Sequence, residues 1–228
     1  LQIVSNGSSV RADQIEGYFA RGTYDYDHKY FINVSFRRDA SIHFQDNNKW
    51  GNFWTAGAAW LLSREHWFNT PWVSSLKLKA SYGSQGNDDI GDFRYTDTYS
   101  IAPGDVGAII FNNKGNPDIT WETNKSTNVG FEANFFSGRL TAEFDMFYRK
   151  TSDMLMRISP PSSAGYGSYY ANAGNMVNKG LELTLSGDII HSGDFVWNAG
   201  INIMHYRNRI THIPGNRKWS ELYWHAGF

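Results

Sequence analysis

Cysteine is absent from this 228-residue sequence, and so is any continuous apolar run of about eighteen residues. The missing cysteines exclude a disulfide scaffold, a thiolate metal site and a cysteine nucleophile, but they do not identify the compartment. The missing apolar run excludes a transmembrane helix. It does not exclude membrane strands, because a barrel strand exposes only alternate residues to lipid. Charge is balanced too, with 21 Lys and Arg against 22 Asp and Glu, so no nucleic-acid partner is indicated.

Signals of catalysis and of cofactor or metal binding are equally sparse. The seven histidines are scattered without a two-histidine metal motif, and no Gly-x-x-x-x-Gly-Lys-Ser/Thr phosphate loop occurs. Residues 86–92 offer oxygen ligands for calcium, but their spacing does not fit an EF-hand, and an Asx-rich turn is the commoner explanation. The sequence therefore predicts no enzyme, with no catalytic residue, no cofactor and no metal site.

The most regular pattern lies in residues 127–150, where apolar and polar side chains alternate on both sides of Ser137-Gly138. Alternation with period two is typical of β-strands, so two strands joined by a tight turn are predicted. Each strand has about ten residues or more, roughly what a tilted strand needs to cross a bilayer. In these two strands Phe147 is the one exception on the polar face. The apolar face carries Val129, Phe131, Ala133, Phe135, Leu140, Ala142, Phe144, Met146 and Tyr148.

Six further segments are predicted as strands, which gives about eight in all. They are residues 14–24, 30–38, 50–62, 76–83, 181–189 and 195–203. The facing of 50–62, which is rich in Gly and Ala, is ambiguous. In the segment 181–189, Leu181, Leu183, Leu185 and Ile189 are assigned to the apolar face. Residues 63–75 have room for a short helical turn capped by Ser63, and two long polar loops cover residues 84–120 and 151–178.

Link lengths differ systematically between the two ends of the predicted sheet. The first, fifth and seventh links are short and the fourth and sixth are long, so small turns gather at one end and large loops at the other. Aromatic residues lie near both ends of the predicted strands, as they do at the two interfaces of a membrane. The turn end has Tyr24, Tyr26, Tyr30, Phe135, Phe136, Phe195 and Trp197, and the loop end has Trp50, Tyr82, Trp121, Tyr148 and Tyr206. The predicted fold is all-β, an antiparallel transmembrane β-barrel.

Several motifs are similar to those of one family. They are Phe36-Arg-Arg-Asp39 followed by Trp50-Gly51, Leu76-Lys-Leu-Lys-Ala-Ser-Tyr-Gly83 with Gly86-Asn87, Gly115-Asn-Pro-Asp-Ile-Thr-Trp-Glu-Thr123, Asn128-Val-Gly130, Phe147-Tyr-Arg-Lys-Thr151 with Asp153, and Asn178-Lys-Gly-Leu-Glu182. In combination, over residues 15–210, they resemble the C-terminal half of the barrel of a SusC/RagA-type TonB-dependent outer-membrane transporter of Bacteroidetes.

The resemblance implies a fragment of a larger, twenty-two-stranded barrel that is filled by a plug and crosses the outer membrane many times. It also implies a SusD-like surface lipoprotein that closes over the loops, energy from the TonB complex, and oligosaccharide or oligopeptide cargo. A dimer of transporter–lid pairs is compatible with it. We therefore expect residues 1–228 to be part of one barrel domain, with the plug, the TonB box and the signal peptide outside this chain.

The barrel prediction assigns a direction to many side chains. The residues predicted to face lipid are Val129, Phe131, Phe144, Leu181, Leu183 and Leu185. The residues predicted to face the lumen or the plug are Lys77, Lys79, Glu132, Glu143, Asp145, Glu182 and Asp188. Carboxylates that share a strand face can do acid and base work, but charges are expected along a wet lumen, and we favour that interpretation.

Aromatic residues in the two long loops are candidate contacts for ligand or lid, because flat rings stack on sugars and peptides. They are Phe93, Tyr95, Tyr99, Tyr166, Tyr169 and Tyr170. The competing explanation is that they pack the loops against each other or against a partner. Three other functions remain open: a passive porin-like barrel, a soluble carbohydrate-binding β-sandwich and, with the least support, an enzyme.

Overall fold

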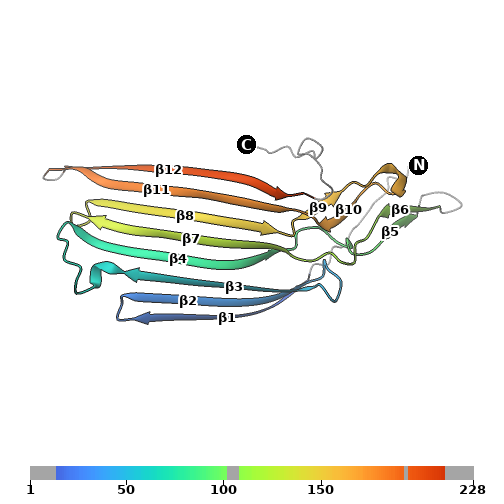
Figure 1. Ribbon diagram of the computed structural model, residues 1–228, viewed down its shortest axis with the longest axis horizontal. Coiled ribbons are helices and arrows are strands. Elements are labelled where there is room, and N and C mark those ends of the chain that lie inside the picture. Colours follow the sequence, from blue (N-terminus) through green and yellow to red (C-terminus); the bar gives the residue numbers. More distant parts are fainter. Residues whose placement is uncertain (1–13, 102–107, 193–194, 214–228) are drawn as a thin grey trace, which may run out of the picture.

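The computed structural model describes residues 14–101, 108–192 and 195–213. Its main body is one antiparallel sheet of eight strands, in the order β1-β2-β3-β4-β7-β8-β11-β12 (Figure 1). The strands are β1 (Ile15–Tyr26), β2 (Tyr30–Ser41), β3 (Trp50–Leu61), β4 (Val73–Asn87), β7 (Glu122–Phe135), β8 (Leu140–Ser152), β11 (Asn175–Ser192) and β12 (Phe195–His212). All eight predicted strands are therefore present in the sheet, each paired with its predicted sequence neighbour.

The long loops contain more structure than their polar composition predicts. Residues 84–120 include the hairpin β5 (Thr98–Ile101) and β6 (Ile109–Asn113), and residues 151–178 include β9 (Leu155–Ile158) and β10 (Tyr169–Asn172). The described residues also include two 3-10 turns, η1 (Leu62–Arg64) and η2 (Ser162–Ala164). The predicted cap is wrong, because Ser63 lies inside η1, whose N-cap residue is Leu61 and makes no side-chain hydrogen bond. In the described part of the chain, neither helical turn is long and apolar enough to cross a membrane.

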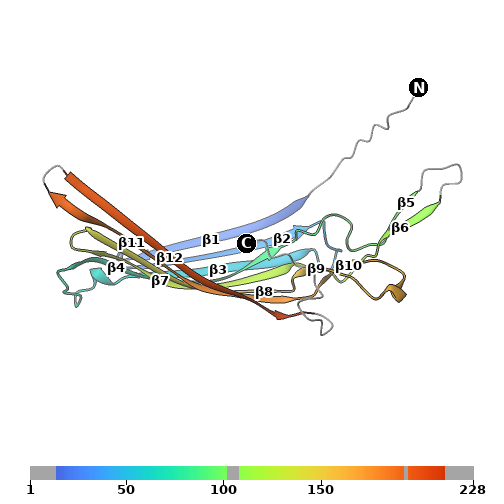
Figure 2. The ribbon, with the colours of Figure 1, turned by 90° about the horizontal axis from the view of Figure 1, so that it is seen from above.

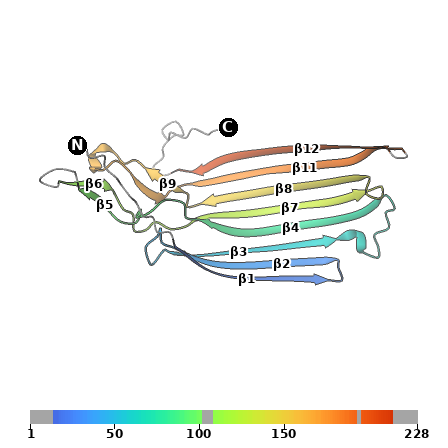
Figure 3. The ribbon, with the colours of Figure 1, turned by 180° about the vertical axis from the view of Figure 1, so that it is seen from behind.

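Small turns and large loops lie at opposite ends of the sheet. Figures 1 and 3 show the links β1–β2 and β7–β8 at one end, with the end of β11 and the start of β12, and the hairpins β5–β6 and β9–β10 at the other. The tight turns use left-handed backbone, with φ of 53° at Asp27, 59° at Ser137 and 88° at Gly138. Figure 2 shows that the sheet is curved and twisted, like a section of barrel wall.

Strand register keeps apolar side chains on one face across the whole sheet. Directly paired residues share a face, and Val129 pairs with Met146, Phe131 with Phe144 and Leu183 with Phe144. The same register settles the ambiguous strand β3, where Trp54, Ala56, Ala58 and Trp60 join this face. Eleven of its large residues are 39% to 55% exposed: Ile32, Val34, Phe36, Trp54, Leu78, Tyr82, Val129, Met146, Leu181, Ile201 and Ile203. An apolar face of this extent is typical of contact with lipid.

A β-bulge near the short-turn end interrupts the alternation of β11. The register between β11 and β12 passes from Asp188↔Asn198 to Ile190↔Trp197 and leaves Ile189 without a partner. Strict alternation places Ile189 on the apolar face and Ile190 on the polar face, but the extra residue of the bulge brings Ile190 opposite Trp197, on the apolar face. A second bulge, between Val73 and Ser75 in β4, lies at the same end.

Aromatic residues form ring contacts near both ends of the strands. At the short-turn end the ring centroids of Tyr30 and Trp60 are 6.0 Å apart, and those of Trp72 and Phe135 are 5.8 Å apart. At the loop end Trp50 stacks on Tyr18 with a centroid distance of 6.2 Å. Trp121, which was predicted among the aromatic residues of the loop end, is buried within the loops.

Candidate functional site

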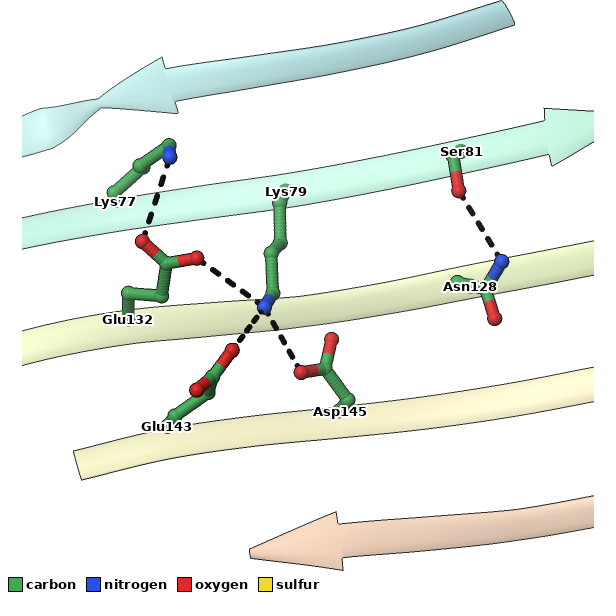
Figure 4. A network of polar contacts seen from close by, with 7 residues as sticks. All are labelled: Lys77, Lys79, Ser81, Asn128, Glu132, Glu143 and Asp145. Carbon is green, nitrogen blue, oxygen red and sulfur yellow. Dashed lines mark hydrogen bonds and ion pairs between the residues drawn. The ribbon is translucent and has the colours of Figure 1, made fainter. Parts of the chain in front are cut away.

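Lys79 of β4 lies at the centre of a charged network on the polar face of the sheet (Figure 4). Its Nζ is 2.7 Å from Glu143 Oε1, 2.9 Å from Asp145 Oδ2 and 3.3 Å from Glu132 Oε1. The ammonium group of Lys77 adds a contact of 3.4 Å to Glu132 Oε2. The network therefore connects β4, β7 and β8 through side chains as well as through backbone hydrogen bonds.

Gly130 of β7 leaves room for this network. It pairs with Lys79 on one side and with Asp145 on the other. A Cβ atom at position 130 would overlap the Asp145 carboxylate and the carbonyl oxygen of Phe144. A side chain there would separate the lysine of β4 from the aspartate of β8, so the glycine permits a contact across an intervening strand.

Five of the seven residues predicted to line the lumen meet in this network, and the other two lie farther along the same face. Glu182 of β11 pairs directly with Asp145, whereas the carboxylate of Asp188 accepts a hydrogen bond of 3.1 Å from Asn198 Nδ2. Phe147, the apolar exception on this face, is buried over Gly180, where a Cβ would lie 2.7 Å from the end of the ring. On this polar wall, Gly180 leaves room for the ring of Phe147.

An apolar cluster fastens the long loops at the other end of the sheet. It consists of Phe44, Phe53, Ile90, Ile119 and Trp121, and Ile119 has no exposed surface. The Trp121 ring lies 5.4 Å from that of Phe44 and 5.3 Å from that of Phe53. The loops therefore form a packed platform and not a set of independent chains.

The motif Gly115–Thr123 supplies the polar contacts of this platform. Asn116 Nδ2 donates to the carbonyl of Tyr170 at 3.0 Å, and Trp121 Nε1 donates to the carbonyl of Lys49 at 2.9 Å. Asn172 bonds Thr120 twice, accepting at 2.8 Å and donating at 2.7 Å. Three loops that are distant in the sequence are joined in this way. Sequence reasoning found the motif through family resemblance but did not identify the cluster, whose apolar members are spread through polar segments.

The six predicted loop aromatics do not form one patch. Tyr95 and Tyr170 pack against the apolar cluster, and the guanidinium of Arg94 lies 4.9 Å from the Tyr170 ring. Tyr99 makes an edge contact with Phe111 in the β5–β6 hairpin, and Tyr166 makes one with Tyr169 in the other loop. Phe93 is exposed and has a φ of 57°. Packing of the loops therefore accounts for part of this set.

A cavity of about 290 Å³ places Tyr95 beside charged residues from two other segments. Glu16 comes from β1, and Asp46 and Lys49 come from the link between β2 and β3. Lys49 Nζ and Asp46 Oδ1 are 3.1 Å apart. An aromatic ring beside groups of both charges suits a polar organic ligand, so this cavity is the candidate ligand site at the loop end. Its charged residues had no recognisable signal in the sequence.

The Asn- and Asp-rich segment 86–92 folds as a turn against His43 in the link between β2 and β3. Asn87 Oδ1 accepts from the backbone N–H of Asp89 at 3.2 Å, as in an Asx turn. The carboxylates of Asp88 and Asp92 each lie 3.4 Å from a ring nitrogen of His43. Across residues 14–101, 108–192 and 195–213, no group of three or more metal-binding side chains is gathered for an ion.

Asp97 anchors the base of the β5–β6 hairpin. Its Oδ1 accepts from the backbone N–H of Gly115 at 2.8 Å, and both carboxylate oxygens lie 3.1 Å from Lys114 Nζ. The Gly115 hydrogen bond, followed by the bond to Lys114, holds the pKa of this carboxyl below its ordinary value. The charged form of Asp97 is therefore the one that supports the hairpin.

Comparison with known proteins agrees with this arrangement. A family model described as TonB dependent receptor-like, beta-barrel matches residues 3–220. TonB-dependent receptor P26 of Formosa agariphila is 33% identical over 208 residues, which are 89% of this chain and 21% of that protein. TonB-dependent receptor SusC of Bacteroides thetaiotaomicron is 29% identical, over 92% of this chain and 22% of that protein.

The sheet also matches a solved structure, that of the RagAB peptide transporter, with a TM-score of 0.81 and 33% identity. The match covers 87% of this chain and 22% of that one. The chain spans 20% to 22% of the length of the curated relatives it matches. The open sheet accordingly fits one section of a larger barrel.

Proposed function

Because this chain belongs to the TonB-dependent receptor β-barrel family, we propose that it forms part of the wall of a SusC-like nutrient importer in the outer membrane. The cargo is an oligosaccharide or oligopeptide fragment. A SusD-like surface lipoprotein closes the loop end, and the TonB complex supplies energy through a part of the receptor outside residues 1–228. The relatives' names support this proposal, since one is SusC and another is a peptide transporter.

The observation that carries the proposal is the division of one sheet into two chemically opposite faces. One face presents large apolar side chains to its surroundings, and the other holds Lys77, Lys79 and three carboxylates in an ionic network. Charged residues on the lipid face of a barrel are destabilising, whereas a water-filled lumen tolerates them. The sheet is therefore suited to separate lipid from a hydrated transport path.

The packed loop platform supports a role in cargo capture at the extracellular mouth. It lies at the end of the sheet opposite the tight turns, where outer-membrane barrels place their long extracellular loops. The cavity beside Tyr95 opens in this platform. A lid that closed over this end would enclose cargo held there.

Uptake by the full-length receptor tests the proposal. The receptor is produced with its surface lipoprotein, purified from outer membranes and analysed for bound cargo by mass spectrometry. Cells are then compared for uptake of that cargo with and without functional TonB, and we expect uptake only when TonB is functional. Swelling of liposomes that contain the receptor without TonB would instead favour a passive pore. Recovery of the receptor in the soluble fraction without detergent would favour a carbohydrate-binding sandwich.

Alanine substitutions test the loop aromatics as ligand contacts. Tyr95→Ala removes the ring from the cavity and should weaken cargo binding about tenfold or more, since one aromatic contact contributes about 0.5–1.5 kcal/mol beyond its buried area. Phe136→Ala, an exposed aromatic in a tight turn at the opposite end, is the matched control and should leave binding unchanged. Equal effects of the two substitutions would remove the support for the cavity as the cargo site.

A further inference from the structure

Basic residues interrupt the apolar face of the sheet at its loop end. They occupy two neighbouring rows of directly paired residues that cross β7, β8, β11 and β12, here called the basic rungs. One rung is Thr127↔Tyr148↔Lys179↔Arg207, and the other is Lys125↔Lys150↔Val177↔Arg209. Alternation along each strand places both rungs on the same face as Val129, Met146 and Leu181.

The five cations of the basic rungs have no counter-charge within the sheet. Lys179 directly faces Arg207, and Lys125 directly faces Lys150, although like charges directly opposite each other destabilise a sheet. All five side chains are exposed, and none forms an ion pair with a carboxylate of residues 14–101, 108–192 or 195–213. An anion from outside the chain would relieve the repulsion.

The cations lie at one edge of the lipid-facing surface. Residues 127–135 of β7 are about as long as a tilted strand that crosses a bilayer, so the basic rungs lie at the loop-end edge of the hydrocarbon. At the short-turn edge the corresponding row is Phe135↔Leu140↔Gly187↔Ala199, which has no charge. Basic side chains that only reached for water would suit both edges equally. The asymmetry points to headgroups of the outer leaflet, on the side of the long loops.

An apolar groove of about 450 Å³ lies directly beside the cations. Toward the middle of the membrane it is lined by the row Val129↔Met146↔Leu181↔His205, and Lys179 and Arg207 line its other side. A groove that is apolar below and cationic above is complementary to a lipid with acyl chains and an anionic headgroup. Arginine binds phosphate through paired hydrogen bonds, and lysine binds it as a point charge.

We propose that the basic rungs bind the phosphorylated headgroup of an outer-leaflet lipid, whose acyl chains lie in this groove. A phosphate monoester carries about 1.5 to 2 negative charges at pH 7, so one headgroup balances the facing pair Lys179 and Arg207. The site lies on the outside of the wall, opposite the network around Lys79. Its ligand is therefore a component of the membrane and not the cargo.

Native mass spectrometry of the full-length receptor in detergent tests the lipid site. The probes are phosphatidic acid and phosphatidylcholine with identical acyl chains, which differ in headgroup charge but not in their apolar part. The unmodified receptor should prefer phosphatidic acid. The double variant Lys179→Gln/Arg207→Gln should bind it about 25-fold more weakly, since each cation near an anionic lipid surface contributes roughly fivefold. Lys150→Gln alone should lose roughly fivefold, which keeps the test available if the double variant does not fold.

Arg149→Gln is the matched control. Arg149 is the neighbour of Lys150 and is also exposed, but it pairs with Asn178 on the polar face, and its guanidinium lies 5.1 Å from the Phe147 ring. The control removes the same charge at the same depth and should leave lipid binding unchanged.

Three results would overturn the proposal. The first is equal binding of the two lipids, and the second is unchanged binding of phosphatidic acid by the variants of the basic rungs. The third is equally strong binding of inorganic phosphate, which has no acyl chains. Because the measurement uses neither cargo nor TonB, failure of the transport proposal would not affect it.

Discussion

Adjacent residues in the middle of β11 offer a direct test of the two faces. Leu183 pairs with Phe144 on one side and Ile203 on the other, so its neighbours are apolar. Thr184, the next residue, pairs with Glu143 and Asn202 on the polar face. The two positions lie at nearly the same depth and differ mainly in the direction of the side chain, so Leu183→Arg and Thr184→Arg form a matched pair.

The expected difference follows from the cost of a cation in lipid. Arginine on the lipid face near mid-bilayer costs about 2–4 kcal/mol. This corresponds to roughly 30-fold to 700-fold in the folding equilibrium. Arginine at position 184 would meet water and the Glu143 carboxylate, so Thr184→Arg should change the free energy of unfolding by less than about 1 kcal/mol.

Folding of the full-length receptor into lipid vesicles provides the measurement. The folded fraction is determined from the heat-modifiable mobility of the barrel on gels, as a function of denaturant concentration. Leu183→Arg should shift the transition to a clearly lower denaturant concentration, and Thr184→Arg should not. Equal shifts for both variants would refute the assignment of the apolar face to lipid.

Three further predictions concern the polar network and the loops. Lys79→Met leaves three carboxylates without their shared cation. The substitution should lower the free energy of unfolding by about 1–3 kcal/mol in the same vesicle assay, a value between those for exposed and buried ion pairs. A change below the error of the assay would mean that water screens the network fully. Trp121→Ala removes a ring from the core of the loop platform, where large-to-small changes cost about 3–5 kcal/mol. Limited proteolysis should then cut the loops while the sheet stays intact, and unchanged cleavage would argue against a packed platform. The pKa of Asp97 is lowered in the folded protein, so its stabilising contribution is present above the ordinary carboxyl pKa and is lost as the pH falls through the lowered value. Exchange at the base of the β5–β6 hairpin should increase in acid for the unmodified receptor but not for Asp97→Asn, and identical acid profiles would contradict the assignment.

Strand facing could be predicted because period-two alternation survives wherever pairing is regular. The apolar face of β7 and β8, from Val129 to Tyr148, is found in the register as the sequence predicted. The network around Lys79 was predicted only as a set of lumen residues. Its geometry depends on which strands are neighbours and on the space above Gly130, and single-strand patterns contain neither.

The sequence was least informative where contacts are long-range. The bulge at Ile189 was not predicted, because a bulge depends on the partner strand and leaves no local mark in the sequence. The hairpins β5–β6 and β9–β10 are short, and the polar residues around them resemble an irregular loop. The apolar cluster joins residues from Phe44 to Trp121, so none of its contacts can be recognised within a single segment. Six loop aromatics were predicted as contacts, and the structure distributes them over four places.

The bulge at Ile189 determines where this chain tolerates a change of length. Side chains alternate with a period of two, so deleting one residue in a regular part of β11, such as Thr184, would exchange the faces of every residue between the deletion and the next irregularity. Deleting Ile189 would only convert the bulge into regular pairing, with Asp188 and Ile190 still opposite Asn198 and Trp197. Single-residue insertions and deletions during the evolution of such walls should therefore accumulate at bulges near the short turns. Between the bulges, the membrane itself fixes which residues of a strand point outward, because the apolar face must contact lipid.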